Sequence, residues 1–106
     1  WDEHAHYAPD GKRIVWMSSK DLRFSINPFD LQTDFWLMNL DGSRKAHLTR
    51  FHTPRHPHYL ARSFAVAADF DWSPDGSQIM GLVITHRPDT RRRGSGLIVL
   101  IDLPNQ

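Results

Sequence analysis

The same short phrase occurs twice in this sequence, and this internal repeat constrains the fold more than any other feature. "YAPDGKRI" begins at Tyr7 and "WSPDGSQI" begins at Trp72, 65 residues further along the chain. An apolar, β-rich stretch follows each phrase, and each copy has a second such stretch, "DFWLMNL" from Asp34 and "GLIVLIDL" from Gly96. Self-similarity at a fixed spacing is typical of folds built from repeated supersecondary units. We therefore expect two related small sheets.

The repeated phrase has the chemistry of a β-turn. In "SPDG", the ring of Pro74 presets φ, Asp75 can accept hydrogen bonds from nearby backbone amides, and Gly76 tolerates the positive φ that closes the turn. "APDG" and the Asp-Gly pair in "NLDGSR" carry the same signals between strand-like runs. The expected turn residues are Pro9, Asp10, Gly11, Asp41, Gly42, Pro74, Asp75 and Gly76.

The spacing of apolar residues favours strands throughout, because no segment shows a sustained helical stripe. We expect strands at 4–7, 13–18, 34–40 and 45–49 in the first copy, and at 68–72, 78–85 and 97–102 in the second. The fold is therefore predicted to be all-β. We divide the chain into a first unit at 1–50 with an insertion at 20–33, a connecting loop at 51–66 that includes "LARSF", and a second unit at 67–106 that lacks its outer strand.

Composition excludes several classes of function. A length of 106 residues fits one domain, and a net charge of +1 gives no broad basic face for nucleic acid. No apolar run approaches the roughly 20 residues of a membrane-spanning helix. The absence of cysteine excludes disulfides and thiolate metal sites. Because the first residue is Trp1 and not Met, we expect the chain to be a segment of a longer protein.

Three stretches carry a family resemblance: "HAHYAPDGKRIVWMSS", "DFWLMNLDGSRKAHLTRF" and "FDWSPDGSQIMG" resemble the WD40-like (PD40) repeat of TolB-like β-propellers. The resemblance implies two four-stranded antiparallel propeller blades, the second incomplete, within a larger or assembled β-propeller. It also implies a periplasmic or otherwise extracytoplasmic location. The sequence departs from the repeat at Ala8, which replaces a serine, and in the second copy, which has no counterpart of the closing pair Leu48-Thr49.

Function is predicted from this resemblance in two alternative forms. The first is a non-catalytic scaffold that binds protein or ligand, with the remaining propeller blades or other protein chains as partners. The second is an accessory domain that gates substrate in a larger enzyme, such as a peptidase or a metal- or haem-dependent oxidoreductase. The chain contains no G-x-S-x-G nucleophile motif and no other catalytic motif, so the sequence supports no catalytic residue in this segment.

Histidines at the start of the chain suggest one candidate metal site. His4 and His6 alternate on the first expected strand, so both should point to the same side, with Glu3 beside them. Two imidazoles and a carboxylate could hold a divalent metal. The alternative is that both rings pack at the sheet edge and bond backbone groups. We predict no other cofactor.

Two loops are candidates for ligand or partner binding. "RFHTPRHPHY" offers His52, His56, His58 and Tyr59 as a binding rim, and the alternative is a stiff surface connector. "RPDTRRRGSG" places Arg91, Arg92 and Arg93 together, where they could meet a phosphate or an acidic patch; the alternative is a solvated loop tip. The strand tryptophans Trp16, Trp36 and Trp72 are predicted to pack between sheets.

Overall fold

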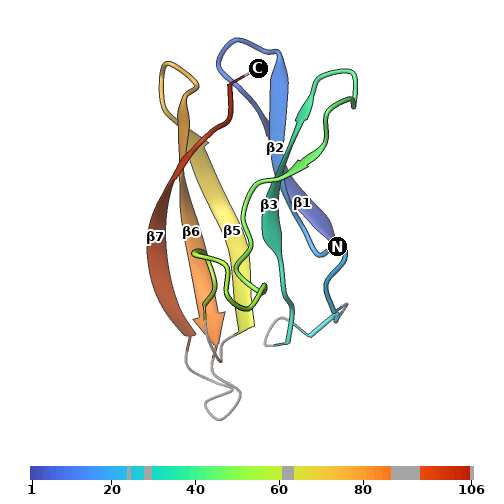
Figure 1. Ribbon diagram of the computed structural model, residues 1–106, viewed down its shortest axis with the longest axis vertical. Coiled ribbons are helices and arrows are strands. Elements are labelled where there is room, and N and C mark those ends of the chain that lie inside the picture. The colour runs from blue at the N-terminus through green and yellow to red at the C-terminus, as the bar shows by residue number, and fades with distance from the viewer. Residues whose placement is uncertain (24, 28–29, 61–63, 87–93, 106) are drawn as a thin grey trace.

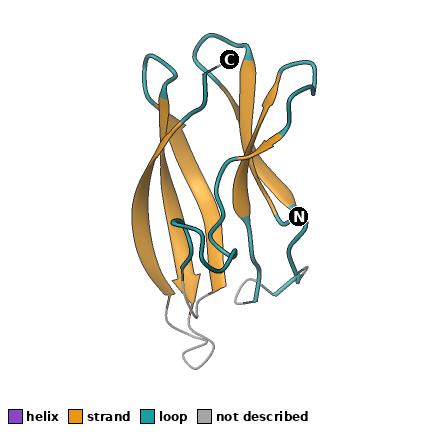
Figure 2. Cartoon of the chain, in the orientation of Figure 1, coloured by secondary structure: helices purple, strands orange, loops and turns teal. Residues whose placement is uncertain are grey.

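The computed structural model describes residues 1–23, 25–27, 30–60, 64–86 and 94–105, and this part of the chain forms two antiparallel sheets (Figures 1 and 2). The first sheet has the order β1-β2-β3-β4 and the second has the order β5-β6-β7. The strands are β1 (Asp2–Tyr7), β2 (Arg13–Ser18), β3 (Asp34–Asn39), β4 (Ala46–His47), β5 (Phe64–Trp72), β6 (Gln78–His86) and β7 (Gly94–Asp102). The predicted all-β class, with four strands in one unit and three in the other, is confirmed.

The expected turns form as the sequence predicts. Gly11, Gly42 and Gly76 have φ of 71°, 84° and 73°, values that favour glycine. In the two repeated phrases, the amides of Gly11 and Gly76 each donate to the carbonyl three residues earlier, at Ala8 and Ser73, over 2.9 Å in both cases. The two hairpins are therefore equivalent in hydrogen bonding as well as in sequence.

The largest departure from the expected strands is the beginning of β5. Residues 64–67 belong to the strand, although the sequence suggested a connector there. Ala65 and Ala67 are fully buried against the first sheet, and their carbonyls accept bonds from Thr33, from its amide at 3.1 Å and from its hydroxyl at 2.9 Å. Alanine is a poor strand former in isolation, but here its small side chain allows the close approach of a second sheet.

The core lies between the two sheets, which stand side by side along the long axis of the molecule (Figure 1). Its buried apolar members come from both sheets and from the loop after β4: Val15, Met17, Phe35, Leu37, Phe51, Ala65, Ala67, Phe70, Ile79 and Val83. Phe35 of β3 contacts Phe70 of β5 edge to face, with ring centroids 5.4 Å apart. Aromatic contacts of this kind add to the burial of apolar area that holds the sheets together.

The sheets stack front to back. Their equivalence is fixed by the hairpins: Ala8 bonds Arg13 and Ser73 bonds Gln78 in the same way, 65 residues apart. In this register Val15, which faces the second sheet, corresponds to Met80, which faces away from the first sheet on β6. Two sheets of a sandwich related by a twofold axis would bury equivalent residues on both sides. Here, opposite faces of equivalent sheets meet instead.

Candidate functional site: the two outer sheet faces

The outward face of the second sheet is apolar and exposed. Cross-strand pairs place Met80 beside Leu100 and Leu82 beside Ile98, and paired residues in an antiparallel ladder lie on the same side. Met80, Ile98 and Leu100 are 54%, 69% and 66% exposed. We name this surface the tail face and define it as Met80, Leu82, Ile84, Ile98 and Leu100. A contiguous apolar patch of this kind is typical of an interaction surface.

The tail face is the repeat equivalent of a surface that is already buried within the chain. In the first sheet, the equivalent positions form the wall that faces the second sheet. The pairs of equivalent residues are Val15 with Met80, Met17 with Leu82, Phe35 with Ile98, and Leu37 with Leu100. The four residues of the first sheet are at most 4% exposed. Both members of every pair are apolar. The tail face therefore has the composition of a buried packing surface, although no described residue covers it.

The outward face of the first sheet is a second surface, and it is partly covered, since Trp36 and Ser18 are only 6% and 2% exposed. We name it the head face and define it as Ile14, Trp16, Ser18, Trp36 and Met38. Its repeat equivalents in the second sheet include Ile79, Gly81 and Val83, which pack on the first sheet in the core. The two-sheet structure therefore has two different outer faces. The tail face corresponds to the first sheet's side of the contact between the sheets, and the head face corresponds to the second sheet's side.

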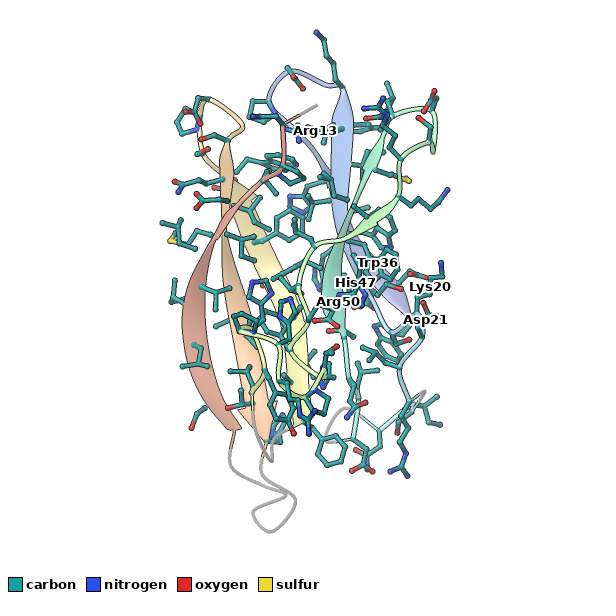
Figure 3. The ribbon with its side chains drawn as sticks, in the orientation of Figure 1. Arg13, Lys20, Asp21, Trp36, His47 and Arg50 are labelled. Carbon is teal, nitrogen blue, oxygen red and sulfur yellow. The ribbon has the colours of Figure 1, made fainter. Side chains whose placement is uncertain are left out.

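Aromatic side chains form the centre of the head face. Trp16 and Trp36 lie opposite each other on β2 and β3, with ring centroids 6.2 Å apart. His47 of β4 stacks on Trp36 at 4.5 Å, and the Lys20 ammonium lies 4.9 Å from the Trp36 ring, as the cluster in Figure 3 shows. Trp16 is held by a 3.2 Å hydrogen bond from its indole nitrogen to Asp2. These contacts fix the orientation of both rings.

A hollow of about 590 Å³ lies over the same tryptophans. Its lining includes Trp1, Met38 and Lys45 in addition to the paired indoles. The walls are mainly apolar, with lysines among the lining residues. The apolar part of this surface suits an apolar partner side chain.

A buried carboxylate, that of Asp34, holds the His47 ring of the aromatic cluster in place. Asp34 is 1% exposed and accepts hydrogen bonds from the Thr49 hydroxyl at 2.8 Å, from the Phe51 amide at 3.0 Å and from Nε2 of His47 at 2.9 Å. The proton on Nε2 is assigned from this contact, since a carboxylate accepts. This network fixes β4 and the His47 ring. The sequence analysis missed it, although the pair Leu48-Thr49 marked the segment.

Among the residues that the structure describes, the second sheet has no counterpart of this network. The residue equivalent to Asp34 is Leu97, which is 42% exposed at the edge of β7. The described part of the second sheet therefore has no carboxylate at the position from which Asp34 holds β4.

The predicted metal ligands do not gather into one site. A bulge interrupts the ladder between Glu3 and His6, and His4 has a positive φ of 54°. The regular alternation of side chains, from which we predicted that His4 and His6 point to the same side, is therefore broken. His4 lies 3.1 Å from Asp69 of β5 and 3.6 Å from Glu3, whereas the His6 ring packs on Phe70 at 4.9 Å. Within the described residues, no group of three or more potential metal ligands is found.

The histidine loop is held by its own hydrogen bonds. His52 donates from Nε2 to the Ala65 carbonyl at 2.9 Å, which ties the loop to β5. The rings of His56 and His58 lie 4.5 Å apart, and the His58 amide donates to His56 Nδ1. Desolvation, followed by the nearby His56, lowers the pKa of His58. Tyr59 remains partly exposed at 38%.

The loop borders a second hollow. This hollow, of about 540 Å³, lies between the loop and β7, and His58, Phe51 and Leu100 contribute to its lining. The structure therefore places His58 at a hollow beside β7, while His52 serves the internal contact. Arg91, Arg92 and Arg93 lie outside the described residues.

The fold and its two faces define an all-β protein built from two equivalent antiparallel sheets. Comparison with protein-family models, curated proteins and solved structures finds no match for the chain. Among the described residues, no helix is long and apolar enough to cross a membrane.

Proposed function

We propose that the chain is a non-catalytic scaffold unit of a TolB-like β-propeller, in which its sheets act as consecutive blades and bind further protein sheets. The front-to-back stacking of equivalent sheets carries this proposal. In a propeller, each blade packs one face on the opposite face of its neighbour, and ring closure covers the last pair of faces. The head and tail faces are the surfaces that such a ring would cover.

Burial of the tail face would stabilise this arrangement. Met80, Ile98 and Leu100 are each more than half exposed, and covering their remaining apolar area would contribute on the order of 3–5 kcal/mol before the cost of association. When sheets belong to one polypeptide, the linker supplies a high effective concentration and reduces that cost. A scaffold function also suits the chemistry of the exposed tail face and of the half-buried Ile14, Trp16 and Met38 on the head face, which are apolar or aromatic.

A tandem protein tests the proposal directly. Three copies of the sequence would be joined by flexible Gly/Ser linkers of about 20 residues, which span roughly 25 Å on average. We expect the tandem protein to unfold roughly 5–10 °C above the single chain and to bind less of an apolar dye per copy, because internal head and tail faces become covered. Thermal unfolding followed by circular dichroism, together with dye fluorescence, measures both effects.

The matched control carries Ile98→Lys and Leu100→Lys in every copy of the tandem protein. Both side chains are exposed in the single chain, so the substitutions should leave each copy folded. The control tandem is expected to unfold at the temperature of its own single chain. An unsubstituted tandem protein with the melting temperature and dye binding of the single chain would contradict the proposed function.

A further inference from the structure

We infer that the tail face of one copy of this chain docks on the head face of a second copy, so that free chains associate head to tail. This inference rests on the proposed function and names a specific partner for the two faces. In this contact, the second sheet of one molecule would pack on the first sheet of the next molecule. The packing would join the same two sides of the sheets as the contact between the two sheets within one molecule. Such an interface is heterologous, and it forms a ring if the rotation closes.

The first argument is the equivalence of the surfaces. The internal contact joins the wall formed by Val15, Met17, Phe35 and Leu37 to the face that contains Ile79 and Gly81. The tail face is equivalent to that wall, and the head face is equivalent to the opposing side. A tail-to-tail contact would instead join two identical surfaces, and the described part of the chain shows no contact of that kind.

The second argument is that apolar side chains would meet at the equivalent positions. Inside the chain, the large Phe35 ring fills the space above Gly81, where an added Cβ would lie 2.8 Å from the ring. At the equivalent place between two copies, Ile98 would meet Trp16. At this place the smaller residue projects from the tail face and the larger residue lies on the head face, the reverse of the internal contact. Ile98 and Trp16 together are larger than Phe35 and Gly81, so this contact would hold the two sheets further apart.

The third argument concerns the space available. The hollow over Trp16 and Trp36 measures about 590 Å³ and opens on the head face. The Ile98 and Leu100 side chains project from β7 at the matching strand positions. An aliphatic side chain packed on the half-buried Trp16 ring would bury apolar area on both partners with little loss of rotamer freedom, because Asp2 already holds that ring.

Complementary variants test the direction of the contact. The tail variant carries Ile98→Lys and Leu100→Lys, and the head variant carries Ile14→Lys and Met38→Lys. Light scattering over a range of concentrations should show that the unsubstituted chain assembles beyond a dimer and that each variant alone is a monomer. An equimolar mixture of the variants should form a 1:1 dimer, because each supplies the intact face that the other lacks.

Other outcomes overturn the inference. An unsubstituted chain that stays monomeric at all concentrations would do so, as would a head variant that dimerises alone, which indicates tail-to-tail contact. A tail variant that dimerises alone would indicate a head-to-head contact and is equally contrary. If the tandem protein gains stability while the free chain stays monomeric, the proposed function stands and only the second-copy partner is wrong.

Cysteine cross-linking gives a second measurement that does not depend on charged substitutions. The chain has no native cysteine, so single introduced thiols are unambiguous. We expect a mixture of Ile98→Cys and Trp16→Cys proteins to form a disulfide-linked heterodimer at least tenfold faster than a mixture of Ile98→Cys and Tyr59→Cys, whose exposed site lies on the histidine loop. Equal rates in the two mixtures would contradict head-to-tail docking.

Discussion

The ring of Phe35 occupies the space that a side chain at Gly81 would need. A Cβ added at Gly81 would lie 2.8 Å from Cε2 and 2.9 Å from Cζ of Phe35, closer than real Cβ contacts. Phe35 is fully buried between the sheets, and its ring also contacts Phe70. This contact between β3 and β6 is therefore one of those that limit how closely the two sheets approach.

The first prediction is that Gly81→Ala destabilises the protein. The backbone at Gly81 does not have a positive φ, so the cost arises from overpacking against Phe35 and amounts to about 1–3 kcal/mol. Urea unfolding followed by circular dichroism measures the change. Phe35→Leu should relieve the clash, so the double variant should lose less stability than the sum of the single variants.

Gly96→Ala provides the control for this prediction. Gly96 lies on exposed β7, and an added Cβ would meet only the flexible end of Leu82 at 3.3 Å. The expected change is smaller than about 0.5 kcal/mol. Strict additivity of Gly81→Ala and Phe35→Leu, or an equal loss at Gly96, would show that the Phe35 contact does not limit the approach of the sheets.

Local chemistry made the hairpins and most of the strands predictable from sequence. Pro-Asp-Gly specifies a turn within a few residues, and the repeat implies that both turns have the same geometry, as Gly11 and Gly76 confirm. The beginning of β5 was not predictable in this way. Ala65 and Ala67 belong to a strand because Thr33, far away in sequence, bonds their carbonyls. Contacts of that range leave no local pattern.

The candidate site was predicted only in part. The resemblance implied other blades or protein chains as partners, which stays a prediction, but no sequence pattern singled out Ile98 and Leu100 as exposed. The predicted pairing of His4 and His6 relied on strict alternation, which the bulge in β1 breaks. The Asp34 network escaped notice because a carboxylate at the start of a strand also suits a solvated turn, and only the position of β4 decides between these roles.

The second prediction concerns the buried carboxylate. Asp34→Ala should destabilise the protein by about 3–5 kcal/mol, because the Thr49 hydroxyl and the Phe51 amide would lose their acceptor in a buried place. Loss of the support for His47 should also change the environment of Trp36, which stacks on that ring. Urea unfolding followed by tryptophan fluorescence measures both effects.

Asp102→Ala is the matched control for Asp34→Ala. Asp102 is an exposed carboxylate on β7 that accepts one hydrogen bond, from Gln78 at 2.6 Å. Because its partner remains accessible to water, the loss should stay below about 1 kcal/mol. Similar losses at Asp34 and Asp102 would mean that the buried network contributes no more than a surface contact.

The third prediction uses the difference between the two turns, Ser73 in one and Ala8 in the other. The Ser77 amide, followed by the hydroxyls of Ser73 and Ser77, lowers the pKa of Asp75 to about 2. Ser73→Ala removes the 2.7 Å bond from the Ser73 hydroxyl, so the pKa of Asp75 should rise toward its usual 3.8. The carboxyl carbon shift of Asp75, followed by NMR during acid titration, measures this pKa directly.

The same substitution should change the dependence of stability on pH. Because the pKa of Asp75 is lower in the folded than in the unfolded state, its contribution is complete above pH 3.8 and is lost as the pH falls through about 2. The free energy of unfolding should therefore decrease less steeply between these pH values in Ser73→Ala than in the unsubstituted protein. In an Asp75→Asn background, where no carboxylate titrates at this turn, Ser73→Ala should leave the slope unchanged. If it still flattens the slope there, the hydroxyl acts through a group other than Asp75.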